Sequence, residues 1–154
     1  MKNIREAFIK DYNNFIRSIE LEDIYVSDLS FKRSGNIPED IQIPVKVTIK
    51  PTKNGYKKVN TDLYEVTHRV LFKLEYIQER QRKVFFELKA TYKLIYRAKF
   101  ELTDEIFKIF VERNVPINVI PFLRETISNS MYRAGLPPIL LPLVKSEPDS
   151  YKGR

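Results

Sequence analysis

The chain has 154 residues, no cysteine and one histidine, and its 27 basic and 20 acidic residues give a net charge of +7. A chain of this length forms one domain by default and buries enough surface to fold without covalent cross-links. The composition excludes disulfides, thiol catalysis and cysteine-ligated zinc, and it excludes a metal site built from several histidines of one chain.

The charge pattern narrows the classes of partner. A positive balance admits nucleic acid, anionic membranes and acidic proteins. The densest basic clusters, at 53–58 and 80–83, fall in predicted turns, so we expect solvated turns there and regard nucleic-acid binding as unfavoured. The sequence contains no apolar run of the roughly 20 residues that a membrane span needs, and Arg5 and Lys10 interrupt the segment where a signal peptide would be apolar. We therefore expect a cytoplasmic protein.

Residues 3–19 are predicted to form an amphipathic helix, because Ile4, Phe8, Phe15 and Ile19 recur at helical spacing. We expect this apolar stripe to pack on the body of the protein. The alternatives are a movable lid and an oligomer contact.

Four segments with a period of two predict four β-strands, at 22–33, 41–49, 64–76 and 84–100. The last is long for one strand, so we expect a bulge or bend in it.

Two prolines and an Asn-Gly pair predict where the second strand lies in the sheet and where it ends. Pro44 cannot donate to a ladder, which predicts an edge strand, and Pro51 and Asn54-Gly55 predict a turn that ends the strand. In the first strand, Leu29 and Phe31 are assigned to one face and Ile24 and Val26 to the other. Apolar residues on otherwise polar strand faces favour a subunit contact on the outer sheet face; they are Leu29, Leu71, Phe85 and Ile95.

Two helices follow the strands. Thr103 is predicted to cap a short first helix. Asn118 is predicted to cap the second, with Pro121 in its first turn and Gly135 just past its end. The apolar, proline-rich residues 136–143 are expected to be extended. These elements predict an α+β domain over 1–144, an antiparallel sheet with helices packed on one face, and a flexible tail at 145–154.

No catalytic or cofactor site is predicted. His68 falls in the middle of the third strand on its apolar face, which is typical of a buried, hydrogen-bonded histidine. The sequence contains no nucleophile-elbow, phosphate-loop or dinucleotide-binding motif. We therefore expect neither an enzyme nor a bound metal or cofactor.

The C-terminal half resembles the SecB family of protein-export chaperones. The residues that carry the resemblance are Asn118, Pro121-Phe122, Arg124-Glu125, Ile127-Ser128, Arg133-Ala134-Gly135-Leu136-Pro137-Pro138, Leu141, Pro142 and Val144. Residues 24–31 and 63–70 look like the first and third strands of the family. The resemblance covers about 21–144 and leaves residues 1–20 as an extra N-terminal helix.

This resemblance implies a Greek-key sheet, a homotetramer built as a dimer of dimers, and an ATP-independent holdase for unfolded or precursor polypeptides, with protein export as the candidate process. It implies a client groove between the loop before the second strand, that strand and the C-terminal segment. The candidate client-binding residues are Ile37, Ile41, Ile43, Val45, Val47, Ile49, Phe122, Met131, Leu136, Ile139 and Leu140.

The sequence departs from the family pattern in two places. Family members carry a second, lid-like helix after the proline-rich segment, whereas this chain has the tail; the helix at 3–19 is a hypothetical replacement. Asp28 matches one acidic residue of the family's translocase contact, but Lys32 stands where a glutamate is usual, which puts docking to a SecA-type motor in doubt.

Two other functions are alternatives to a general holdase. A SecB-like chaperone dedicated to one partner, such as the antitoxin of a toxin–antitoxin pair, has the same sequence features. A nucleic-acid-binding α+β module would need exposed aromatic residues beside basic ones. Tyr92 and Tyr96 share the apolar face while Lys93 and Arg97 lie opposite, which argues against that module.

Overall fold

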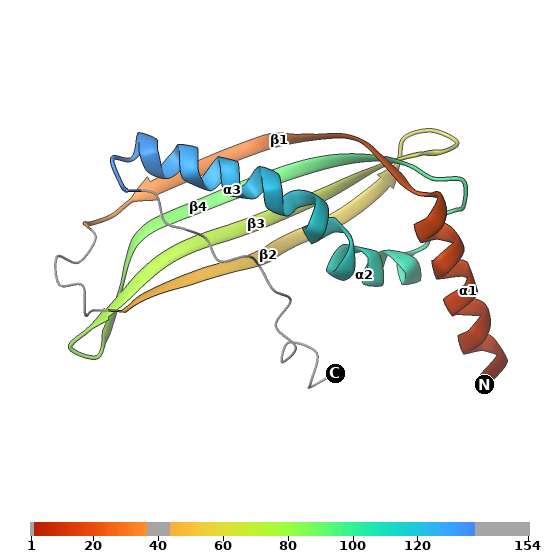
Figure 1. The fold of residues 1–154 in the computed structure, drawn as a ribbon, viewed down its shortest axis with the longest axis horizontal. Helices are drawn as coiled ribbons and strands as arrows, with labels where there is room; N and C mark the ends of the chain where they lie inside the picture. The colour runs from red at the N-terminus through yellow and green to blue at the C-terminus, as the bar shows by residue number, and fades with distance from the viewer. Residues whose placement is uncertain (1, 37–43, 138–154) are drawn as a thin grey trace.

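The computed structural model describes residues 2–36 and 44–137 (Figure 1). The elements are α1 (Lys2–Ser18), β1 (Glu20–Arg33), β2 (Val45–Lys58), β3 (Leu63–Gln78), β4 (Gln81–Arg97), α2 (Asp104–Arg113) and α3 (Val115–Arg133). The predicted tail at 145–154 lies outside the described residues. Within the described part of the chain, no helix is long and apolar enough to cross a membrane.

The four strands form one antiparallel sheet in the order β1-β4-β3-β2. Strands β2, β3 and β4 follow one another as neighbours, and β1 lies beside β4, which is the Greek-key arrangement. The predicted fold class is confirmed. Strands β1 and β2 are the two edges of the sheet.

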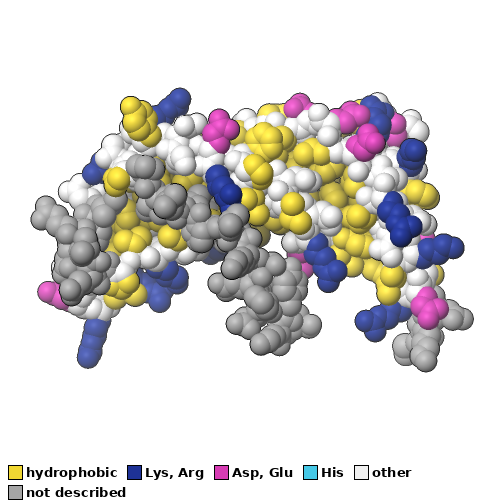
Figure 2. Space-filling model, in the orientation of Figure 1, with side chains coloured by type: hydrophobic (Ala, Val, Ile, Leu, Met, Phe, Trp, Pro, Cys, Tyr) yellow, Lys and Arg dark blue, Asp and Glu magenta, His cyan; other side chains and the backbone are white. Residues whose placement is uncertain are grey.

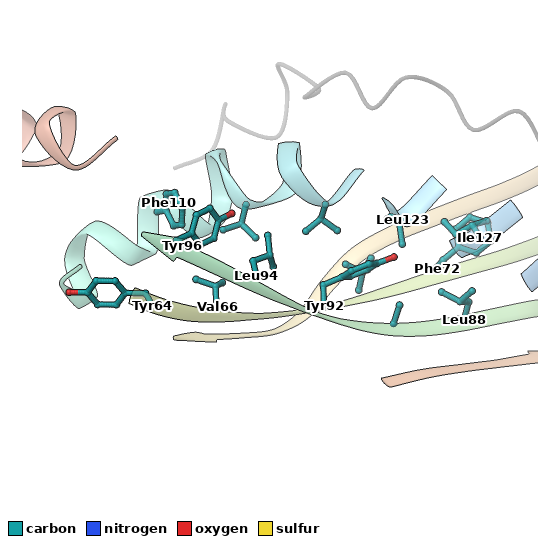
Figure 3. Close-up of a cluster of buried hydrophobic side chains, with 14 of the residues drawn as sticks. Tyr64, Val66, Phe72, Leu88, Tyr92, Leu94, Tyr96, Phe110, Leu123 and Ile127 are labelled. Atoms are coloured by element: carbon teal, nitrogen blue, oxygen red, sulfur yellow. The ribbon is translucent and has the colours of Figure 1, made fainter. Parts of the chain in front are cut away.

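Helices α2 and α3 pack on one face of the sheet (Figure 1). The even-numbered residues of β3 and β4 face these helices because side chains alternate along a strand. Figure 3 shows the resulting core, in which Phe110, Leu123 and Ile127 of the helices lie over Tyr64, Val66, Phe72, Leu88, Tyr92, Leu94 and Tyr96 of the strands. Burying each large apolar side chain contributes roughly 1.5–3 kcal/mol.

Two bulges in β1 change which of its side chains face the helices. The register of β1 against β4 shifts between Leu21 and Asp23 and again between Val26 and Asp28. Each shift adds a residue and reverses the alternation of side chains. As a result, Ile24, Val26, Leu29 and Phe31 pair with the core-facing residues Leu94, Tyr92, Ala90 and Leu88 and lie on the helix side. The assignment of Leu29 to the outer face was wrong.

A third bulge, in β4, places the Phe85 side chain on the helix side of the sheet and not on the outer face as predicted. The register of β3 against β4 shifts after Leu74, and the Phe85 ring is buried 5.9 Å from the ring of Tyr76. Leu71 and Ile95 do lie on the outer face, where both are half-buried. Two of the four residues predicted for a subunit contact on the outer face therefore lie on that face.

Strand β2 does not end at Asn54-Gly55 as predicted; it runs on to Lys58 through a bulge between Pro51 and Lys53. An edge strand tolerates Pro51 because not every N–H of an edge is needed in the ladder. Beyond the bulge, the Tyr56 hydroxyl donates to Asp104 Oδ1 at 2.6 Å, and this bond holds β2 to the start of α2.

The helix boundaries follow their capping residues. Thr103 accepts a hydrogen bond from the Ile106 N–H, as predicted for the cap of α2. Helix α3 begins at Val115, earlier than predicted, with Pro116 in its first turn, and Asn114 precedes it without a side-chain capping bond. Asn118, the predicted cap, and Pro121 therefore both lie inside the helix. Gly135 follows α3 with a φ of +71°, a conformation that glycine adopts without a Cβ penalty.

Helix α1 packs on α2 through its C-terminal half. Phe15 is fully buried, with its ring 5.5 Å from the Phe110 ring in an edge-on arrangement, and Tyr12 Oη donates to Asn114 Oδ1 at 2.9 Å. Near the N-terminus, by contrast, Ile4 is 77% exposed. Helix α1 lies at the opposite end of the sheet from the C-terminal end of α3 (Figure 1).

Candidate functional site

A partly exposed apolar strip runs along the helix side of the edge strand β2. It consists of Val45, Val47 and Ile49. These residues pair with Tyr76, Leu74 and Phe72 of the neighbouring strand β3. Helix α3 lies over β4, so it leaves this edge of the sheet less covered (Figure 1). Val45 is 37% exposed, and Val47 and Ile49 are half-buried. The strip therefore offers both apolar side chains and a strand edge.

Lysines flank the apolar strip. Figure 2 shows hydrophobic side chains on the helix-bearing side of the molecule, with Lys and Arg side chains at its rim. Along β2, Lys46 and Lys50 alternate with the strip residues, lie on the opposite face of the sheet and are exposed. An apolar surface rimmed by polar groups is typical of a binding site.

Three further predicted client-binding residues that the structure describes do not join this strip. Phe122 is 41% exposed, but it lies on the side of α3 that faces β1, at the far edge of the sheet. Met131 and Leu136 are 1% and 4% exposed and belong to the core, so placing them on a surface for clients was wrong. Five predicted residues lie outside the described part of the chain; they are Ile37, Ile41, Ile43, Ile139 and Leu140.

A cavity of about 260 Å³ between β1 and α3 was not predicted. Val26 and Leu29 of β1 line one side, Phe122 and Glu125 of α3 line the other, and Tyr92 of β4 also contributes. The apolar residues of β1 were the only sequence signal for this cavity. The bulges that turn Leu29 toward α3 cannot be predicted from the spacing of apolar residues. The cavity places a second partly open apolar surface at the β1 edge.

His68 is a structural residue. Its side chain is 3% exposed and its Nδ1 lies 2.5 Å from Asn54 Oδ1. Burial lowers the pKa of His68 from 6.5 to about 4, so the imidazole is neutral near pH 7. Since Asn54 Oδ1 can only accept, Nδ1 carries the proton. Within residues 2–36 and 44–137, no group of three His, Asp or Glu side chains is placed to hold a metal ion.

Asp28 lies on the sheet face that is opposite α2 and α3. It pairs with Thr91, and its carboxylate is 3.4 Å from Arg69 Nη2. Lys32 lies on the same face, paired with Glu87. The positive neighbour Arg69 reduces the negative potential at Asp28.

The Greek-key sheet, the helices on one face and the apolar strip on an edge strand together define a small α+β protein with a surface suited to binding. A family model described as "Preprotein translocase subunit SecB" matches residues 13–147, and the chain therefore belongs to the SecB family. The predicted resemblance is confirmed.

Curated relatives and solved structures agree with this membership. The chain is 28% identical over 137 residues to "Protein-export protein SecB" of Anaplasma marginale (strain Florida), covering 80% of this chain and 75% of the relative. It is 27% identical over 127 residues to the protein of the same name from Methylobacillus flagellatus, covering 82% and 78%. Its fold is similar to the Mycobacterium tuberculosis Rv1957 SecB-like chaperone, solved with a ChAD peptide from the Rv1956 HigA1 antitoxin, with a TM-score of 0.68, 12% identity and coverage of 88% and 97%.

Proposed function

We propose that this protein is an ATP-independent holdase that binds unfolded or precursor polypeptides in the cytoplasm and keeps them competent for export. The observation that carries the proposal is the apolar strip of Val45, Val47 and Ile49 on β2, which is an edge strand among the described residues. Family membership and the names of the curated relatives support the link to export.

The strip suits clients of many sequences. An extended segment can add to a free strand edge through backbone hydrogen bonds, which every sequence can make. The apolar side chains of β2 then cover alternate apolar side chains of the client. Neither contact needs a nucleotide or a shaped pocket, which fits a chaperone that holds clients without consuming ATP.

We further propose that the protein assembles as a dimer of dimers. The β1 edge is 14 residues long and carries four apolar side chains, Leu21, Val26, Leu29 and Phe31, that are 37–40% exposed. A long apolar strand edge left free in a monomer promotes uncontrolled pairing. A second copy placed on β1 would cover it, and the exposed α3 residues Ile117 and Tyr132 offer a second contact surface.

Two alternative functions are not favoured. The antitoxin peptide belongs to a neighbour that is 12% identical, which is a likeness of fold alone. For a nucleic-acid module, Tyr92 and Tyr96 would have to be exposed, but both are buried and bonded to the helices: Tyr92 Oη donates to Thr126 Oγ1, and Asn118 Nδ2 donates to Tyr96 Oη, each at 2.8 Å.

The test is the aggregation of a chemically unfolded protein, followed by light scattering after dilution with and without this protein and without ATP. We expect near-stoichiometric amounts to suppress scattering. The double variant Val45→Ser/Val47→Ser should lose several-fold of this activity, whereas Val59→Ser, an exposed valine beyond the end of β2, should not. An absence of suppression by the wild-type protein across several clients would overturn the proposal.

A further inference from the structure

Strand β2 carries two chemically different rows along one edge. Val45, Val47 and Ile49 form the apolar row on the helix side, and between them Lys46, Thr48 and Lys50 point to the outer face. Thus two lysines alternate with three apolar residues over six positions. The bulge between Pro51 and Lys53 ends this regular stretch.

The free edge fixes how an added chain would meet these rows. Among the described residues, β2 pairs only with β3, so its other edge retains unpaired backbone groups. An extended segment that pairs there sends its side chains alternately to the two faces. Residues directly opposite in an antiparallel pair have Cβ atoms about 4.5–5.5 Å apart, within reach of a lysine side chain.

The outer row, Lys46, Thr48 and Lys50, remains positively charged when the charges of the neighbouring side chains are included. Glu75 lies across from Lys46, but it is buried and its carboxylate is 3.3 Å from Lys73 Nζ. Within the described part of the chain, Lys46 and Lys50 take part in no ion pair within 4.0 Å, and both are exposed. Beyond the bulge, Lys53 continues the positive charge on the same face.

We propose that the β2 edge selects extended segments in which apolar residues alternate with acidic ones, over segments in which apolar residues alternate with basic ones. This inference rests on the proposed function, and it names the class of polypeptide that the same strip prefers. Opposite charges placed across a strand pair stabilise the pair and like charges destabilise it. Lys46 and Lys50 would face glutamates in a peptide that alternates apolar and acidic residues, and lysines in a peptide that alternates apolar and basic residues. The protein should bind the first peptide roughly tenfold more tightly than the second.

The test uses three fluorescently labelled peptides and the full-length protein, with binding followed by anisotropy. One peptide alternates valine and glutamate, one alternates valine and lysine, and the third has the composition of the first with its valines and glutamates in separate blocks. We expect the alternating glutamate peptide to bind about tenfold more tightly than the other two. The preference over the lysine peptide should shrink as salt is added, because exposed charges are screened.

Variants separate the lysine row from net charge. Lys46→Glu/Lys50→Glu should reverse the preference, and Lys46→Gln/Lys50→Gln should abolish it. The matched control is Lys99→Glu/Lys108→Glu, which changes exposed lysines outside the stretch Val45 to Lys50 and also lowers the net charge from +7 by four, to +3. This control should keep the order of the three peptides. Circular dichroism of each variant checks that the fold is intact.

The outcomes distinguish two failures. Equal affinity for the glutamate and lysine peptides, or a reversal of the preference in the Lys99/Lys108 control, overturns the inference while suppression of aggregation still supports the holdase. Binding of none of the peptides, together with no suppression of aggregation, overturns the proposed function as well.

Discussion

The buried imidazole of His68 donates a hydrogen bond from Nδ1 to the side-chain oxygen of Asn54 at 2.5 Å. The two residues are directly paired across β3 and β2. This bond satisfies a polar group inside the core and ties the second half of β2 to the sheet. A buried donor left without a partner would cost about 1–3 kcal/mol.

The depressed pKa of His68 makes stability depend on pH. In the unfolded chain the group titrates near 6.5, and in the folded chain near 4. As pH falls through this window, the unfolded state takes up a proton that the folded state does not, so the free energy of unfolding decreases. The full difference is about 3 kcal/mol. Chemical unfolding of wild type and His68→Asn should be measured between about pH 7 and pH 4. We expect the free energy of unfolding to fall more steeply with decreasing pH in wild type, because the carboxylates contribute equally to both proteins and only wild type has the histidine. Parallel plots of this free energy against pH would contradict the prediction.

Removing the acceptor should destabilise the protein at neutral pH. We expect Asn54→Ala to lower the free energy of unfolding by about 1–3 kcal/mol, because the His68 N–H loses its partner inside the core. The control is Thr52→Ala, an exposed residue of the same strand, which should change stability by less than about 0.5 kcal/mol. Urea unfolding followed by circular dichroism measures both. Equal effects of the two substitutions would show that the bond contributes little.

Asn54 also shows where the sequence misleads. Asn-Gly is a strong turn signal when only local conformation is considered. Here the pair continues β2, because Asn54 meets His68 across the sheet, a contact that local spacing does not reveal. The alternation in β3 and most of β4 was readable because one face of each is buried along nearly its whole length. The two faces of β1 could not be assigned from the sequence, because two bulges each reverse the alternation of its side chains.

The candidate site was predictable to a similar degree. Val45, Val47 and Ile49 lie on the edge strand that Pro44 had indicated. Met131 and Leu136 could not be assigned, because an apolar residue has the same spacing whether it fills the core or lines a groove. Only the packing of α3 on the sheet decides between these cases.

Helix α1 should depend on Phe15 for its attachment to α2. We expect Phe15→Ala to cost about 3–5 kcal/mol in the packing of this helix, because the ring is fully buried against Phe110. The helix should then be cleaved faster by trypsin at Lys10 and Arg17. Ile4→Ala, in the exposed first half of α1, is the control and should leave the cleavage rate unchanged. Similar rates in wild type and Phe15→Ala would mean that Tyr12 and the other contacts of α1 are enough to hold it.

The β1 edge should control assembly. Val26 and Leu29 are 38% and 40% exposed and line the cavity against α3, so placing lysines there should be tolerated by the monomer fold. In a subunit interface, however, the same two lysines would lose their hydration and disrupt apolar packing, which is unfavourable. We therefore expect Val26→Lys/Leu29→Lys to lower the mass of the assembly toward the 18.3 kDa of one chain.

Size-exclusion chromatography with multi-angle light scattering measures this mass directly. The matched control is Ile77→Lys, an equally exposed apolar residue at the end of β3, away from β1. It should keep the mass of the wild-type assembly. If Val26→Lys/Leu29→Lys also kept the wild-type mass, with its circular dichroism unchanged, β1 would not be a subunit interface, and the exposed α3 residues Ile117 and Tyr132 would be the next surface to alter.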